Sequence, residues 1–208
     1  MSQFRFRSLD GSDIMPEEWL HMWADLYPSA DYAGYEELIV RHKSFSHADI
    51  ERIGRWKDNA KTEGKWKPNV ASVAYEIWMQ AASELPVCPK DDLTADFLDD
   101  WSGRKYTDEF GIRRVEKRFG LSRATTLLHF VSGGGFPIFD SRVRKAMTRL
   151  LSSHAPNTVR WYLDSYRPLF LEIAALCRTR DLRTVDMALF SYGGKKIGEP
   201  PIRVASPS

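Results

Sequence analysis

The longest regular pattern in the 208-residue chain is a run of apolar residues at helical spacing. Its members are Val70, Val73, Ala74, Ile77, Trp78, Ala81 and Leu85. This spacing places all of them on one face of a long α-helix, which Pro86 ends. Such a face has to be buried against other elements. Because alternating strand patterns are scarce, with FRFRSL near the N-terminus as the one example, the chain is expected to be all-α.

Shorter helical patterns follow one another along the rest of the chain. Pro16 suits the first turn of a helix that runs through Leu26. The sequence SHAD, 46–49, is typical of a capping box at a helix start. Further helices are expected over 32–40, 70–85, 93–101, 108–118, 122–131, 141–152, 157–166, 168–178 and 181–192. Gly193 and Gly194 are expected to end the last one in the left-handed conformation.

Charge is unevenly distributed, although the formal net charge is only +2. Residues 112–149 contain nine Lys/Arg and two acidic residues, which gives +7. Residues 84–100 contain six acidic residues and one lysine, which gives −5. A basic stretch beside an acidic one produces a directional field that favours a polyanionic partner. A solvated basic face is the alternative interpretation.

The two cysteines, Cys88 and Cys177, cannot form a metal or iron–sulfur cage by themselves. No pair of histidines or carboxylates has the spacing of a metal site, so neither a metal nor another cofactor is expected. The N-terminus has no apolar leader segment, and no stretch approaches the length of a membrane span. The sequence therefore predicts a soluble, cytoplasmic protein without membrane contact, and we expect a monomer.

The segment RRVEKRFGLSRATTLLHFV, 113–131, is expected to be a helix, a tight break and a second helix. Gly120 can take positive φ in the break, and Ser122 can cap the second helix. The unpaired N–H groups of that second N-terminus would attract phosphate, with Arg123 beside them. A plain αα-hairpin is the alternative. His129, among apolar neighbours, is expected to be a packed, hydrogen-bonded histidine.

The sequence GGGFPIFDSRVRKAM, 133–147, places one carboxylate, Asp140, at the start of a helix. Asp140 is either an N-cap or the acid of an active site, and the two roles are compatible. The glycines before it let the backbone come close to a sugar-phosphate chain. Polar residues of the following helix lie off its apolar face and are candidate phosphate binders. The candidate DNA-binding residues are Gly120, Ser122, Arg123, Gly133, Gly134, Gly135, Ser141, Arg142, Arg144 and Lys145.

Together, FGLSRATTLL, the glycine-rich loop and FDSRV resemble the helix-hairpin-helix DNA glycosylases. In that family a hairpin of the form L-P-G-V-G-x-K-T-A is followed by a helix, a short loop and V-D-T-H-V. The resemblance covers residues 113–152. It implies a two-lobed helical fold: 1–29 and 136–194 form a terminal lobe, 30–135 form a central lobe with the hairpin at 118–123, and 195–208 form a tail.

The sequence departs from the family pattern at three hairpin positions. Phe119 replaces the proline and Ser122 replaces the second glycine. Ala124 stands where the bifunctional members carry their Schiff-base lysine. The cysteine quartet that some members use for an iron–sulfur cluster is absent. The resemblance therefore implies a monofunctional glycosylase without lyase activity.

The implied function is hydrolysis of the N-glycosidic bond of a damaged or modified base in duplex DNA. Asp140 would stabilise the oxocarbenium ion and position the water. A flipped base needs aromatic walls, for which Trp56, Trp66 and Tyr192 are candidates. The alternatives are a non-catalytic helical module that binds DNA or a protein, and a glycosidase acting on RNA or a nucleoside. The identity of the base, and a role in DNA repair by base excision or in defence against modified DNA, are left open.

Overall fold

The computed structural model describes residues 3–27, 34–41, 45–59, 68–85, 91–110, 113–195 and 197. The fold is mostly helical, and the chain divides into two compact units. Unit 1 comprises Met1–Tyr27, Ser141–Pro156 and Leu169–Ser208, and unit 2 comprises Pro28–Asp140 and Asn157–Pro168. The chain thus starts in unit 1, forms most of unit 2 and returns to unit 1. It then adds one more short segment to unit 2 and ends in unit 1. Residues 136–140 and 157–168, which the sequence analysis assigned to the terminal lobe, group with unit 2.

Unit 1 is built around aromatic side chains from its first and last helices. Its helices are α1 (Pro16–Ala24), α7 (Ser141–Leu151), most of α9 (Arg167–Leu176) and α10 (Leu182–Gly194). Pro16 lies in the first turn of α1, as predicted. The ring of Tyr192 packs edge-on against Trp19 and Trp23, with centroids 5.5 and 5.0 Å away. All three side chains are buried, so α1 and α10 share one core.

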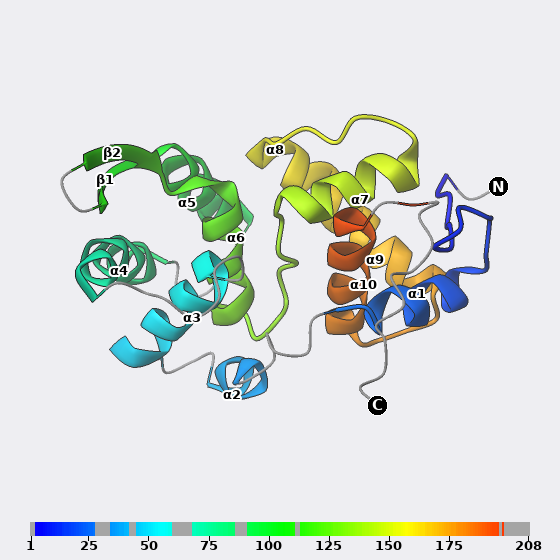
Figure 1. Cartoon of the computed structure of the whole chain (residues 1–208), viewed down its shortest axis with the longest axis horizontal. Helices are drawn as coiled ribbons and strands as arrows, with labels where there is room; N and C mark the ends of the chain where they lie inside the picture. The colour runs from blue at the N-terminus through cyan, green and yellow to red at the C-terminus, as the bar shows by residue number, and fades with distance from the viewer. Residues whose placement is uncertain are drawn as a thin grey trace, which may run out of the picture. The chain divides into compact units, whose positions relative to one another are not determined.

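Helices α7 and α10 lie side by side in unit 1 (Figure 1), and a glycine sets how closely they approach. Gly193 and Gly194 do not end α10 in the left-handed conformation, as the sequence analysis expected, because both belong to its last turn. A Cβ on Gly193 would lie 1.8 Å from the carbonyl oxygen of Arg142 on α7. The glycine is therefore needed for close backbone packing and not for a turn.

We predict that Gly193→Ala destabilises the protein by about 2–3 kcal/mol or more, because backbone atoms of α7 have to move to admit the methyl group. Urea unfolding followed by circular dichroism measures the change. Gly103→Ala is the matched control, since a Cβ there meets nothing within 4 Å. Equal stability of the two variants would contradict the close approach of α7 and α10.

Unit 2 contains α2 (Tyr35–Val40), α3 (His47–Asn59), α4 (Pro68–Ser83), α5 (Asp91–Gly103), α6 (Gly120–Val131), α8 (Val159–Trp161) and the π-helical turn η2 (Tyr162–Tyr166). The predicted capping box of α3 is confirmed. The Oδ2 atom of Asp49 accepts hydrogen bonds from the backbone N–H of Ser46 (2.9 Å) and from its hydroxyl (2.7 Å). These bonds lower the pKa of Asp49 below its ordinary value of 3.8.

We expect Asp49→Asn to lower the free energy of unfolding by about 1 kcal/mol near neutral pH. Because the folded-state pKa is depressed, the charged cap contributes fully above pH 3.8 and its contribution declines as pH falls through the folded value. The difference between variant and wild type should therefore shrink as the pH is lowered below about 4. Thermal unfolding of both proteins across this range tests the prediction. A difference that stays constant with pH would show that the cap acts without its charge.

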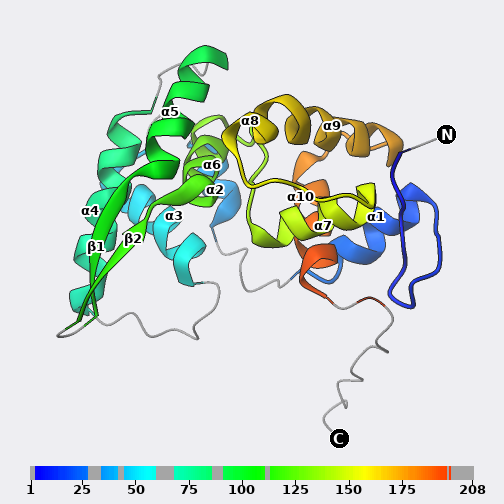
Figure 2. The ribbon, with the colours of Figure 1, turned by 90° about the horizontal axis from the view of Figure 1, so that it is seen from above.

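Residues 105–118 differ from the sequence-based expectation. The predicted helix over 108–118 is wrong, because strands β1 (Lys105–Phe110) and β2 (Arg113–Arg118) form an antiparallel hairpin there (Figure 2). The helix-break-helix arrangement is therefore not formed: α5 and α6 pack against each other, but a β-hairpin connects them. At the N-terminus, FRFRSL forms only an isolated bridge between Arg7 and Asp13.

The hairpin is anchored at its exit by Phe119, which is buried. Its ring packs edge-on against Trp78 of α4 and Trp101 of α5, with both centroids 5.2 Å away. Its backbone N–H donates to the carbonyl oxygen of Arg104 at 2.9 Å, which closes the base of the hairpin. This tertiary packing overrides the weak helical pattern of the segment.

Among the described residues, no helix is both long enough and apolar enough to cross a membrane. In the same part of the chain, no three His, Cys, Asp or Glu side chains gather as a metal site.

Candidate functional site

Asp140 follows an irregular buried segment, Phe136–Phe139, which we call the strap. Buried backbone groups outside helices and sheets need other hydrogen-bond partners. Here side chains supply them. The Nδ1 atom of His129 donates to the carbonyl oxygen of Phe136 (2.7 Å), and the Phe136 N–H donates to the hydroxyl of Ser132 (3.1 Å). The N–H of Phe139 donates to the Thr125 hydroxyl at 3.1 Å.

The two middle carbonyl groups of the strap are bound by tyrosines of the π-helical turn. The hydroxyl of Tyr162 donates to the carbonyl oxygen of Pro137 at 3.0 Å, and that of Tyr166 donates to Ile138 at 3.1 Å. The ring of Phe139 packs against Tyr166, with the centroids 4.9 Å apart, and against Trp161 at 5.5 Å. Side chains of α6 and of Ser132 directly after it thus bind the backbone of Phe136 and the N–H of Phe139. Side chains of η2 bind the carbonyl groups of Pro137 and Ile138, and Trp161 of α8 packs against the Phe139 ring.

His129 joins the strap to α2. The carbonyl oxygen of Phe136 can only accept, so the Nδ1 atom of His129 carries the proton in that bond. In the neutral ring the Nε2 atom then accepts from the Tyr35 hydroxyl, which lies 2.6 Å away. Because His129 is buried, the prediction of a packed, hydrogen-bonded histidine is confirmed.

We predict that His129→Leu destabilises the protein by about 2–4 kcal/mol, because it leaves two buried groups, the Phe136 carbonyl and the Tyr35 hydroxyl, without this partner. Chemical denaturation measures the loss. His154→Leu, at an exposed position, is the control and should change stability by less than about 0.5 kcal/mol. A similar stability of both variants would show that the His129 network contributes little to the fold.

Asp140 itself is paired with a lysine from a distant part of the sequence. Its Oδ2 atom lies 3.5 Å from the Nζ atom of Lys57, in the last turn of α3, and both residues belong to unit 2. The side chains of Asp140 and Lys57 are 16% and 12% exposed. The pair thus brings a carboxylate and an ammonium group together at a largely buried position. Asp140 also directly precedes Ser141, the first residue of α7.

Lys57 was missed by the sequence analysis, although the sequence contains a signal for it. Ile50 and Ile53 are buried on α3, and Lys57 follows them at the spacing i, i+3, i+7. A lysine on the apolar face of a helix is costly to bury unless it is paired. The position of Lys57 on the same helix face as Ile50 and Ile53 therefore indicates that its charge is paired.

The three predicted aromatic walls have different surroundings. Trp56 is half-buried beside Lys57 on α3, and its ring packs edge-on against Phe130 with centroids 5.6 Å apart. Trp66 lies outside the described residues. Tyr192 is fully buried and packs against Trp19 and Trp23 in unit 1. Of the two that the structure describes, Trp56 belongs to unit 2 and directly precedes Lys57 in α3.

The glycine run ends α6. Gly133 and Gly134 have positive φ values of 62° and 87°. Their N–H groups donate to the carbonyl oxygens of Phe130 and His129, which is the pattern of a Schellman motif. The N–H of Gly135 donates to Ser132. The backbone donors of Gly133, Gly134 and Gly135 are therefore used within the chain, and their predicted role beside a phosphate would depend only on the absence of Cβ atoms.

The residues at the start of α6 also differ from expectation. Gly120, with φ 81°, begins the helix, so Ser122 lies within its first turn and is not its cap. Arg123 donates from its Nη1 atom to the carbonyl oxygens of Arg118 (3.2 Å) and Phe119 (2.9 Å). This arginine therefore closes the junction between β2 and α6. Ala124, at the position of the family's Schiff-base lysine, is fully buried.

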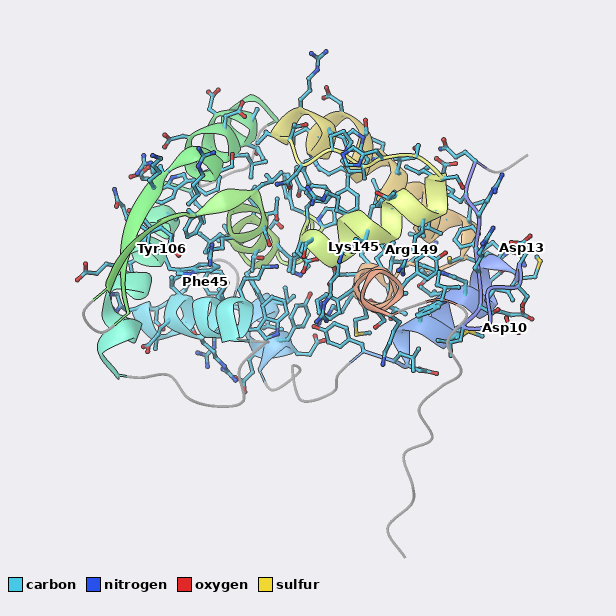
Figure 3. The ribbon with its side chains drawn as sticks, turned by 45° about the horizontal axis from the view of Figure 1, so that its top comes forward. Asp10, Asp13, Phe45, Tyr106, Lys145 and Arg149 are labelled. Atoms are coloured by element: carbon cyan, nitrogen blue, oxygen red, sulfur yellow. The ribbon has the colours of Figure 1, made fainter. Side chains whose placement is uncertain are left out.

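The basic residues after Asp140 belong to unit 1, on α7. Ser141 and Lys145 are exposed, and Arg144 is half-buried. The guanidinium group of Arg142 lies 4.3 Å from the ring centroid of Phe190. Figure 3 labels Lys145 and Arg149 on this helix. Arg149 donates to the backbone carbonyl oxygens of Tyr192 and Lys195, so it joins α7 to the end of α10.

Comparison of the chain with protein-family models, with curated proteins and with solved structures gave no significant match.

Proposed function

We propose that this protein is a monofunctional DNA N-glycosylase that hydrolyses the bond between a damaged or modified base and its sugar. The observation that supports this proposal best is the environment of Asp140. The carboxylate follows a strap whose backbone is bound by five side chains, and it is paired with Lys57 at 3.5 Å. A helix cap alone requires neither of these features.

The chemistry needs an ionised carboxylate in a fixed position. Departure of the base builds positive charge on the sugar, and a carboxylate near C1′ stabilises that charge. The same group can orient or deprotonate the attacking water. In this protein Lys57 holds a positive charge 3.5 Å from the Asp140 carboxylate, and the Lys57 side chain is 12% exposed. Trp56, half-buried beside Lys57, is the proposed wall for a flipped base.

Duplex DNA is the proposed substrate for two reasons. The +7 charge of residues 112–149 suits a polyanion, with Arg144 and Lys145 as its proposed phosphate contacts. The order of α6, a glycine bend, Asp140 and α7 also keeps the part of the glycosylase resemblance that does not involve the helix expected over 108–118. We propose a monomer that acts in the cytoplasm.

We predict that Asp140→Asn abolishes base release and preserves DNA binding, because asparagine can still cap a helix but carries no charge. The assay uses labelled duplexes that each contain uracil, 8-oxoguanine, hypoxanthine or another modified base. Abasic sites are detected by alkaline cleavage, and binding by fluorescence anisotropy. Release that persists in Asp140→Asn would refute the catalytic role. If the wild-type protein binds DNA but releases base from no probe, the non-catalytic module is favoured. If it releases base only from modified RNA or nucleosides, the substrate is RNA or a nucleoside and not DNA.

Two variants of Lys57 extend the same assay. Lys57→Met keeps the length of the side chain and removes the charge, whereas Lys57→Arg keeps the charge. If the pairing supports catalysis, the methionine variant should lose at least about tenfold in kcat/KM and the arginine variant should retain more activity. Melting temperatures of both variants separate this loss from unfolding.

A further inference from the structure

We propose that Tyr162 and Tyr166 are positioning residues for Asp140: through their hydroxyl groups they fix the strap that sets the carboxylate against the substrate. This inference rests on the proposed function, since it concerns the geometry of the same reaction. Neither tyrosine contains the reacting group, and neither is marked by the local sequence around Asp140.

The two hydroxyl groups bind consecutive carbonyl groups of one chain segment. Tyr162 donates to Pro137 at 3.0 Å and Tyr166 to Ile138 at 3.1 Å. Ile138 is two residues before Asp140. With the carbonyl groups of two adjacent peptides bound by one turn, rotation of either peptide plane breaks at least one hydrogen bond. The backbone path into Asp140 therefore depends on both hydroxyl groups.

The donors come from a π-helical turn, which is a rare element that often occurs at functional sites. Tyr162 and Tyr166 are its first and last residues, and both side chains are buried. Their rings lie 5.8 Å apart and both contact the ring of Phe139. The turn thus supplies both hydroxyl donors from buried side chains.

The chemistry of the hydroxyl groups suits a permanent donor. Burial raises the pKa of Tyr162 above its ordinary value, so its hydroxyl keeps its proton through the range in which proteins are stable. A carbonyl oxygen cannot donate in return, so Tyr162 and Tyr166 always act as donors in these two bonds. The remaining carbonyl group of the strap before them, that of Phe136, is bound by His129.

Catalysis is sensitive to such positioning. A displacement of about 1 Å of a reacting group can lower a rate roughly 100-fold even when the substrate binds normally. The hydroxyl groups of Tyr162 and Tyr166 should therefore affect kcat more than KM. A purely structural role predicts the opposite: a lower melting temperature with unchanged kcat in the folded protein.

The test compares Tyr162→Phe, Tyr166→Phe and the double variant with wild type, because phenylalanine keeps the ring packing and removes only the hydroxyl group. Tyr27→Phe is the matched control, since Tyr27 is a buried tyrosine of unit 1. Single-turnover base release is measured on the modified duplexes described above, at a temperature where every variant is folded. Hydrogen exchange of the Phe136 and Phe139 amides reports the strap directly.

Each single variant should lower the rate at saturating enzyme about tenfold and the double variant about 100-fold, with DNA affinity within about twofold of wild type. Exchange of the strap amides should rise in the same order, and Tyr27→Phe should change neither quantity. If wild type is active and the double variant releases base at the wild-type rate, the positioning role is overturned while the proposed function stands. A wild-type protein that releases no base from any probe overturns the proposed function and this inference together.

Discussion

A buried chain segment without regular secondary structure must find a hydrogen-bond partner for each of its peptide groups, and this requirement organises unit 2. In the segment Phe136–Phe139, five of these groups are bound by side chains of α6, of Ser132 directly after it and of the π-helical turn. Those side chains are separated by up to 41 positions in the sequence, from Thr125 to Tyr166. Elements distant along the chain are therefore joined through the residues that precede Asp140. Asp140 directly follows this network, and the proposed function rests on these surroundings more than on the place of Asp140 beside a helix.

Most helices of this protein could be predicted from local sequence, because amphipathic spacing and capping residues act over a few residues. The capping box at Ser46 and Asp49 is a clear example, since its hydrogen bonds join neighbours in the chain. The hairpin of β1 and β2 could not be predicted in this way. It depends on Phe119 packing between Trp78 and Trp101, which come from two other helices. The glycine at 193 is similar, because the reason for it is the carbonyl group of Arg142 on a neighbouring helix.

The candidate site shows the same division between local and distant information. Asp140 is conspicuous in the sequence because glycines and a proline precede it and basic residues follow it. Its partner Lys57 lies 83 positions away in the sequence. The one local sign of the pairing is that Lys57 shares a helix face with the apolar residues of α3. Among the aromatic candidates, Trp56 and Tyr192 have similar sequence surroundings. Trp56 is half-buried and directly precedes Lys57, whereas Tyr192 is a core residue of unit 1. Composition cannot separate them, because both occur among charged and apolar neighbours on a helix.

The end of α6 has a consequence for how any anionic ligand could approach. A run of three glycines is commonly associated with a nest of amides that wraps a phosphate. In this protein Gly133, Gly134 and Gly135 instead turn their N–H groups inward to carbonyl oxygens of the helix that they follow. A polyanion arriving at this bend would meet little positive potential from the main chain. Binding of the proposed nucleic-acid partner would consequently depend on cationic side chains, and its strength would vary steeply with ionic strength.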